Sequence, residues 1–204
     1  MSRRILGIDP GLTRCGVGVI DVANARRCEL VHVDVVRTDV DSDLAKRLQV
    51  IGDAVEILLD KYRPDAVSIE RVFAEARNLN TVMGVAQITG IVLREAASRD
   101  VATELHTPSE VKAAVSGYGR ADKAQVQEMV RRILRLKSAP KPADAADALA
   151  LAICAAYQSP IAKIAPHSRN HGSVDSAVQR GSTPAQEAWL AAEAAAKRPR
   201  RRLG

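Results

Sequence analysis

The sequence has few cysteines and no long hydrophobic run, and each scarcity argues against a class of protein. Cys15, Cys28 and Cys154 are odd in number and form no C-x-x-C pair, so we predict neither a disulfide framework nor a thiolate zinc site. No apolar stretch reaches the roughly 18 residues that a membrane span needs, and residues 1–4 show no secretory signal. We therefore expect a cytoplasmic protein with no membrane partner, whose cysteines are reduced, small apolar side chains.

The net positive charge is concentrated after residue 158. The 204 residues carry 30 Lys+Arg and 24 Asp+Glu, but residues 1–158 are nearly balanced, with 22 basic and 21 acidic side chains. Residues 159–204 hold the other 8 basic and 3 acidic side chains, and the pI of about 9.5 points to an anionic partner. We predict one domain over residues 1–158. A basic, largely disordered tail would follow over 159–204, with room for a short alanine-rich helix.

Hydrophobic periodicity predicts strands first, and then strands alternating with helices. Alternating or short continuous apolar runs predict strands over 5–8, 16–20, 30–38, 65–69 and 101–105. Apolar spacing of three and four predicts helices over 44–63, 82–98 and 122–136, with two more that start at Pro108 and at Asp144. This order predicts an α/β fold, a mixed sheet flanked by helices on both faces, with the first three strands antiparallel.

Glycines mark the predicted helix over 82–98. Gly84 and Gly90 lack a Cβ, so we expect another backbone to approach this helix closely. We therefore predict that the helix forms a dimer contact.

Four acids stand beside these apolar elements. Asp9 follows the first strand, Glu70 follows the fourth, and Asp144 and Asp147 open the last helix. Each has an ordinary explanation as a turn former, a solvated strand end, a helix cap or an acid of a first helical turn. Neighbouring central strands would nevertheless bring Asp9 and Glu70 side by side, and helix positions three apart share a face. We therefore predict that the four carboxylates converge.

Converging carboxylates are typical of a site for hard divalent cations. In a partly buried cluster they repel one another and are driven towards protonation unless a cation neutralises them. Oxygen ligands favour Mg²⁺ or Mn²⁺ over zinc. Two such ions, about 3.5 to 4 Å apart, can activate a water and stabilise the leaving oxygen of a phosphodiester. The acids therefore predict a nuclease.

The GIDPG turn over 7–11 allows a second interpretation. A glycine-rich turn after a strand can bind phosphate, and sugar kinases and actin-like ATPases use a D-x-G turn of this kind. Those proteins need a second, related domain, for which 204 residues leave no room, and the sequence has no Walker A motif. We therefore favour the nuclease interpretation.

Three motifs together carry a family resemblance. ILGIDPG, SIERVF and ADAADALALAI, in this order, closely resemble the RuvC family of Holliday junction resolvases over roughly residues 3–158. The resemblance implies a ribonuclease H-like fold and a homodimer with two active sites. It also implies two Mg²⁺ ions in each site, replaceable by Mn²⁺, and paired symmetric cleavage of a four-way DNA junction. The branch migration proteins RuvA and RuvB are implied as partners.

The resemblance also assigns roles to residues. The family's catalytic and metal-binding acids match Asp9, Glu70, Asp144 and Asp147. Lys112 and Lys123 match basic residues that hold DNA phosphates, and Arg120 lies in the same segment, so all three are expected to bind DNA. Phe73, the only phenylalanine, matches an aromatic residue that inserts against bases at the crossover.

Two alternatives to a junction-cutting enzyme remain open on the sequence. One is a binding scaffold that keeps the fold without chemistry, although such a protein would bind DNA better without acids beside the phosphates. The other is a ribonuclease H-like nuclease that acts on RNA–DNA hybrids or flaps. A solvated helix face is likewise the ordinary explanation for Lys112 and Lys123.

Overall fold

The computed structural model describes residues 2–23, 27–71 and 79–158, all of which lie in the first of two units of the chain, Met1–Lys163. Its strands are β1 (Arg3–Asp9), β2 (Arg14–Ala23), β3 (Arg27–Arg37), β4 (Ala66–Glu70) and β5 (Ala102–His106). Its helices are α1 (Leu44–Tyr62), α2 (Leu79–Ala97), α3 (Pro108–Ser116), α4 (Lys123–Ile133) and α5 (Ala143–Gln158). The predicted tail over 159–204 lies outside the described residues.

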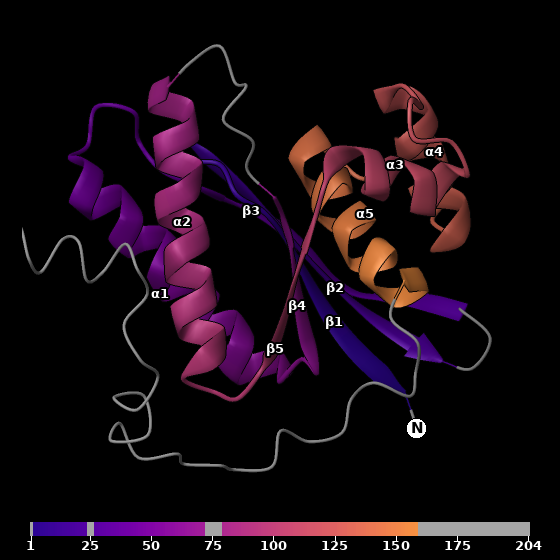
Figure 1. The fold of residues 1–204 in the computed structure, drawn as a ribbon, viewed down its shortest axis with the longest axis horizontal. Coiled ribbons are helices and arrows are strands. Elements are labelled where there is room, and N and C mark those ends of the chain that lie inside the picture. The colour runs from indigo at the N-terminus through magenta and orange to yellow at the C-terminus, as the bar shows by residue number, and fades with distance from the viewer. Residues whose placement is uncertain (1, 24–26, 72–78, 159–204) are drawn as a thin grey trace, which may run out of the picture. The chain divides into compact units, whose positions relative to one another are not determined.

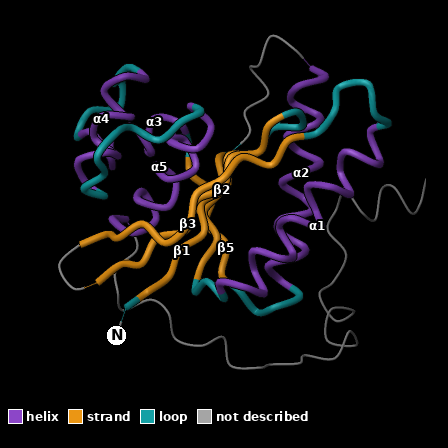
Figure 2. Tube along the Cα trace, turned by 180° about the vertical axis from the view of Figure 1, so that it is seen from behind, coloured by secondary structure: helices purple, strands orange, loops and turns teal. Residues whose placement is uncertain are grey.

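The strands form one mixed sheet in the order β3-β2-β1-β4-β5. β1, β2 and β3 are antiparallel neighbours, whereas β4 runs parallel to both β1 and β5. Figures 1 and 2 show α1 and α2 on one side of the sheet and α3, α4 and α5 on the other. The predicted α/β fold is confirmed. Among the described residues, no helix is long and apolar enough to cross a membrane.

The sheet is buried on both faces, because successive side chains of a strand point in opposite directions. On β1, Ile5 packs in a core with α3, α4 and α5, whereas Leu6 and Ile8 pack in a second core with α1 and α2. This arrangement explains why the first strand is a continuous apolar run rather than an alternating one. The apolar run of β1 ends at Asp9, the charged last residue of the strand.

Backbone contact brings α5 onto β1 and β2. A Cβ at Gly7 would overlap the carbonyl oxygen of Ala148 and lie 2.8 Å from the Ala152 nitrogen, and a Cβ at Gly16 would overlap the carbonyl oxygen of Asp144. Any side chain larger than hydrogen at these two positions would therefore push the helix away from the sheet.

A buried hydrogen bond fixes α5 against β4 as well. The Ser68 hydroxyl is fully buried and donates to the carbonyl oxygen of Leu151 over 2.7 Å. Ser68 lies two residues before Glu70, so the two side chains share one face of the sheet. The same bond therefore helps to set the position of the helix relative to the acid at the end of β4.

The helix boundaries largely follow the predicted signals. Thr107 forms a capping box with Glu110 at the start of α3, and Asp122 forms another at the start of α4. α2 begins three residues earlier than predicted, at Leu79. α5 begins at Ala143, so Asp144 lies inside the first turn rather than opening the helix.

Two smaller predictions have different outcomes. The three cysteines are buried, as expected for small apolar side chains, and burial raises the pKa of the Cys15 thiol to about 12. The close approach predicted at the α2 glycines concerns a partner chain and stays a prediction; among the described residues of this chain, no backbone from outside α2 lies within 4 Å of a Cβ placed at either glycine. A Cβ at Gly84 would meet the side chain of Leu12 at 3.5 Å, and one at Gly90 would meet nothing within 4 Å.

Substitution of Gly7 by alanine is expected to destabilise the protein by about 3 kcal/mol or more, because the new methyl group would collide with backbone rather than with a movable side chain. Gly52→Ala is the matched control. That methyl group would lie 3.4 Å from a methyl group of Ile91, and α1 would gain about 0.5 to 1 kcal/mol from the loss of a helical glycine. Urea unfolding of both variants measures the difference, and equal stabilities would contradict the proposed contact.

Candidate active site

Two acids meet where β1 and β4 end. The parallel register pairs Ile8 with Ile69, and each strand then continues by one acidic residue, Asp9 or Glu70. Because parallel neighbours end at the same edge of a sheet, the two carboxyl groups lie side by side on the face that α5 covers. The predicted juxtaposition of these two acids is therefore confirmed.

The first turns of α5 bring the other two acids to the same edge. Asp144 and Asp147 are three residues apart, so they share a face of the helix, and the packing of Asp144 against Gly16 holds that face on the sheet. Asp9 is the antiparallel partner of Gly16. The negative side chain of Asp144 also lies near the positive end of the helix macrodipole, which offsets part of the repulsion among the acids.

The acids perturb one another strongly. Burial is the largest influence on Asp9, followed by the charges of Glu70, Asp147 and Asp144, and together they raise its pKa from 3.8 to about 7. Burial also raises the pKa of Glu70, against the opposing effect of a hydrogen bond with Asp9. These directions are those of a protonated Asp9 that donates its hydrogen bond to an ionised Glu70.

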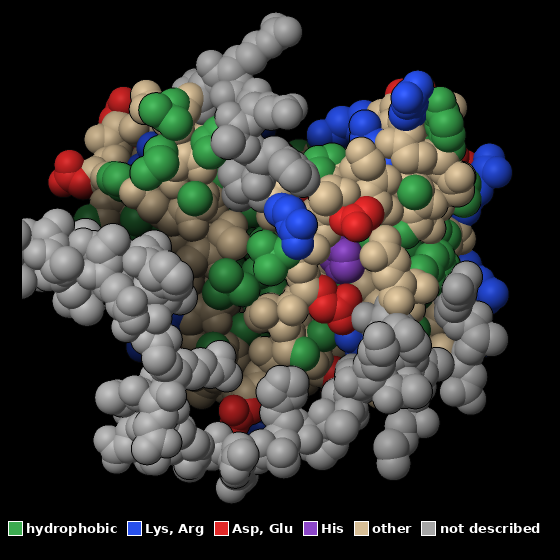
Figure 3. All heavy atoms as spheres, viewed as in Figure 1, with side chains coloured by type: hydrophobic (Ala, Val, Ile, Leu, Met, Phe, Trp, Pro, Cys, Tyr) green, Lys and Arg blue, Asp and Glu red, His purple; other side chains and the backbone are tan. Residues whose placement is uncertain are grey.

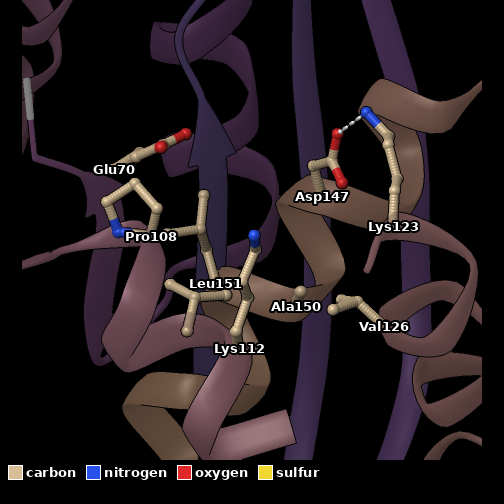
Figure 4. A pocket seen from close by; sticks show the side chains of 9 residues that line it. Glu70, Pro108, Lys112, Lys123, Val126, Asp147, Ala150 and Leu151 are labelled. Carbon is tan, nitrogen blue, oxygen red and sulfur yellow. Dashed lines mark hydrogen bonds and ion pairs between the residues drawn. The ribbon is translucent and has the colours of Figure 1, made fainter. Parts of the chain in front are cut away.

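Two basic side chains neutralise the helix acids. The Lys123 ammonium lies 2.7 Å from a carboxylate oxygen of Asp147, as the dashed line in Figure 4 shows. The Arg14 Nε lies 3.3 Å from a carboxylate oxygen of Asp144. Within the described ranges, no three acidic, histidine or cysteine side chains form a ready-made metal cage. In this arrangement, therefore, two ion pairs offset part of the negative charge of the cluster.

A pocket of about 240 Å³ opens beside this cluster. Figure 4 shows Glu70 and Asp147 on its rim together with the amines of Lys112 and Lys123. Its lining also includes apolar side chains from α3, α4 and α5. Carboxylates and ammonium groups therefore share one concave surface, where a phosphate and a cation could be bound next to each other.

Six of the eight residues predicted for the site lie together, one lies outside the pocket, and one is outside the described residues. The cluster and its pocket contain Asp9, Glu70, Asp144, Asp147, Lys112 and Lys123. Arg120 is exposed and is not part of the pocket lining. Phe73 lies outside the described residues.

Two neighbours of the acids were not predicted from the sequence. Arg14 pairs with Asp144, and its position at the start of the strand after the Asp9 turn is the signal that could have suggested it. His106 is buried and is the register partner of Glu70 on β5. Its Nε2 lies 3.4 Å from a carboxylate oxygen of Glu104, and no motif pointed to this contact.

Comparison with known proteins places the chain in a family. The family model described as crossover junction endodeoxyribonuclease RuvC matches residues 5–155. A protein of that name from Leifsonia xyli subsp. xyli is 56% identical over 194 residues, covering 95% of this chain and 93% of the relative. One from Clavibacter michiganensis subsp. michiganensis is 57% identical over 198 residues, covering 94% of this chain and 97% of the relative.

Solved structures give the same result. The chain resembles T. thermophilus RuvC in complex with a Holliday junction substrate, with a TM-score of 0.72 and 38% identity over 76% of this chain and 93% of that one. It shares the fold of the yeast mitochondrial Holliday junction resolvase Ydc2, with a TM-score of 0.56 at 13% identity over 76% of this chain and 79% of that one. The chain therefore belongs to the RuvC family of crossover junction endodeoxyribonucleases.

Proposed function

We propose that this protein resolves four-way DNA junctions by hydrolysing one phosphodiester in each subunit of a homodimer, with its reaction centre at Asp9, Glu70, Asp144 and Asp147. The observation that carries the proposal is the gathering of these acids from two strands and a helix at one edge of the sheet. The similar T. thermophilus protein was solved with a Holliday junction substrate, which favours this substrate over RNA–DNA hybrids.

The donor set fits hard divalent cations. Nucleases of this family depend on divalent metal ions, and we propose two Mg²⁺ in each site, for which Mn²⁺ can substitute. The raised pKa of Asp9 supports the assignment, because burial and then the charges of Glu70, Asp147 and Asp144 disfavour its ionised form, which a cation would stabilise. Asp9 and Glu70 would hold the ions from rigid strands, with Asp144 and Asp147 from α5. Bound ions would activate water and stabilise the leaving oxygen.

Basic side chains around the pocket would bind the DNA backbone. From Pro108 to Lys141 the sequence contains eight Lys or Arg and three Asp or Glu. Figure 3 shows blue side chains gathered over the region of α3 and α4. Lys112 and Lys123 would hold DNA phosphates close to the acids, and Arg120 would contact the DNA backbone farther from the acids. The insertion of Phe73 against bases stays a prediction.

A homodimer would give two symmetric cuts, since a twofold axis relates two copies of one site. α2 supports this assembly, because Leu79 and Met83 are exposed apolar residues, 71% and 53% accessible. They lie four residues apart on one helix face, and a second copy of α2 would bury them. We propose RuvA and RuvB as further partners, from family membership alone.

Asp9→Asn is expected to abolish cleavage and to leave junction binding intact, because the amide keeps the shape of the side chain but removes a charged metal ligand. Cleavage of a synthetic four-way junction in Mg²⁺, together with a gel-shift titration, measures both properties. Asp34→Asn is the control, since Asp34 is an exposed acid on β3. Normal cleavage by Asp9→Asn would remove Asp9 from the mechanism. If the wild type cleaved a flap or an RNA–DNA hybrid faster than the four-way junction, the junction would not be the preferred substrate.

The metal-free protein is expected to lose stability as the pH rises from about 4 to about 7. The raised pKa of Asp9 means that the folded protein keeps a proton that the unfolded chain releases in this range. This contribution is fully present below the unfolded pKa of Asp9 and is lost as the pH passes about 7. Urea unfolding in EDTA at several pH values should show a shallower slope for Asp9→Asn than for the wild type. Identical slopes would contradict the assigned pKa.

Met83→Glu is expected to turn a dimer into a monomer at micromolar concentration, because it places a charge in the proposed apolar contact. Val40→Glu is the control, since Val40 has a similar exposure, 62%, in the segment between β3 and α1. Sedimentation velocity over a concentration series separates the two species. A Met83→Glu protein that remains dimeric would place the interface elsewhere.

A further inference from the structure

We propose that Arg14 and Arg37 form a second phosphate-binding surface, which holds the DNA strand at the ends of β2 and β3, beside the acids. We call these two residues the cross-strand arginine pair. The inference rests on the proposed function and adds to it the path of the DNA over the sheet.

The strand register places the pair. Arg14 begins β2 and is directly opposite Arg37, the last residue of β3, so the two side chains lie on one face with their Cβ atoms about 4.5 to 5.5 Å apart. Gly16, two residues after Arg14, pairs with Asp9 and contacts α5, so this face is the one that carries the acids. Strand spacing and rise put the Cα atoms of Arg14 and Arg37 about 8 and 12 Å from that of Asp9.

The charges of the pair are incompletely compensated. Like charges directly opposite each other on a sheet are unfavourable. The Arg14 side chain is 59% exposed and has Asp144 on one side, whereas Arg37 is exposed and has no carboxylate within 4 Å among the described residues. Asp39, next but one in sequence, accepts instead from the backbone of Asp41. The guanidinium of Arg37 therefore has free donors, and a phosphate placed between the two arginines would stabilise both.

Neighbouring contacts hold the strand ends that carry the pair. Arg47 donates to the hydroxyl oxygens of Thr38 and Thr13 over 3.0 and 2.9 Å. The Thr38 amide donates to the Thr13 carbonyl over 3.1 Å. Thr13 precedes Arg14 and Thr38 follows Arg37, so these contacts fix the backbone next to each arginine before any ligand arrives. A fixed backbone lowers the entropy cost of binding.

A nucleic acid backbone matches this surface. The arginines continue the line of strand ends from Glu70 and Asp9, and the proposed lysines come from helices that pack on the same face of the sheet. A DNA strand that places one phosphate at the acids would bring a neighbouring phosphate over the ends of β2 and β3, where the arginines lie. Guanidinium groups suit this role because they bind phosphate oxygens in pairs.

Arg37→Gln tests the surface, because Arg37 contacts none of the acids. For junction DNA the slope of log K against log salt should become shallower by about 0.9 for one lost phosphate contact. This corresponds to about eightfold weaker binding at 0.1 M salt if affinities converge at 1 M. The melting temperature should be unchanged or higher, since a like-charge neighbour is removed. Arg27→Gln is the control, ten residues and about 33 Å away on the same strand, and its slope should equal that of the wild type.

Neutral methylphosphonate groups, substituted singly along the junction strands, locate the contact. At a position near the cut, the substitution should weaken wild-type binding and have little further effect on Arg37→Gln. An unchanged salt slope for Arg37→Gln, or an equal loss in Arg27→Gln, would overturn the inference while leaving the nuclease proposal intact. A wild-type protein that neither prefers nor cuts four-way junctions would instead defeat the proposed function.

Discussion

The close contact of α5 with β1 and β2 is the constraint on which the site depends. The helix backbone occupies the space of the missing side chains at Gly7 and Gly16, and the buried Ser68 hydroxyl bonds to its third turn. Asp144 and Asp147 have short side chains that cannot compensate for a shift of the helix. A methyl group at Gly7 or Gly16 would push α5 outwards and carry both carboxylates away from Asp9. The packing of the core thus sets the geometry of the acids, and Gly7 and Gly16 act on the site only through the position of α5.

This packing works against electrostatics. Four carboxyl groups held at one sheet edge repel one another, and burial together with this repulsion raises the pKa of Asp9. The protein offsets the repulsion through a proton on Asp9, a lysine on Asp147 and an arginine on Asp144. Bound metal ions would replace the proton and the basic side chains as counter-charges of the carboxylates, and Lys123 and Arg14 would then be free to bind DNA phosphates. A site balanced in this way can exchange internal partners for substrate and cofactor without unfolding.

The sequence allowed the elements and the acids to be predicted, because both follow from local signals. Periodicity identified the strands and helices, and two apolar strands that end in acids identified Asp9 and Glu70. The glycine contacts with α5 could not be predicted, since they join residues more than 100 positions apart and a glycine in a strand has many explanations. The partner of Arg14 was missed for the same reason. A start of α5 at Ala143 rather than Asp144 is a shift within the usual uncertainty of a helix end.

Charge balance in sequence and charge arrangement in space are different properties, and DNA binding depends on the second. Residues 1–158 carry almost equal numbers of basic and acidic side chains, which alone would predict little affinity for a polyanion. The fold places acids at the centre of one sheet edge, and it brings the lysines of α3 and α4 and the arginines of β2 and β3 around them. A phosphate backbone laid across that edge meets cations next to the acids. Attraction at the flanks can therefore hold a phosphodiester against carboxylates that would otherwise repel it, until divalent ions reverse the sign of the charge at the centre.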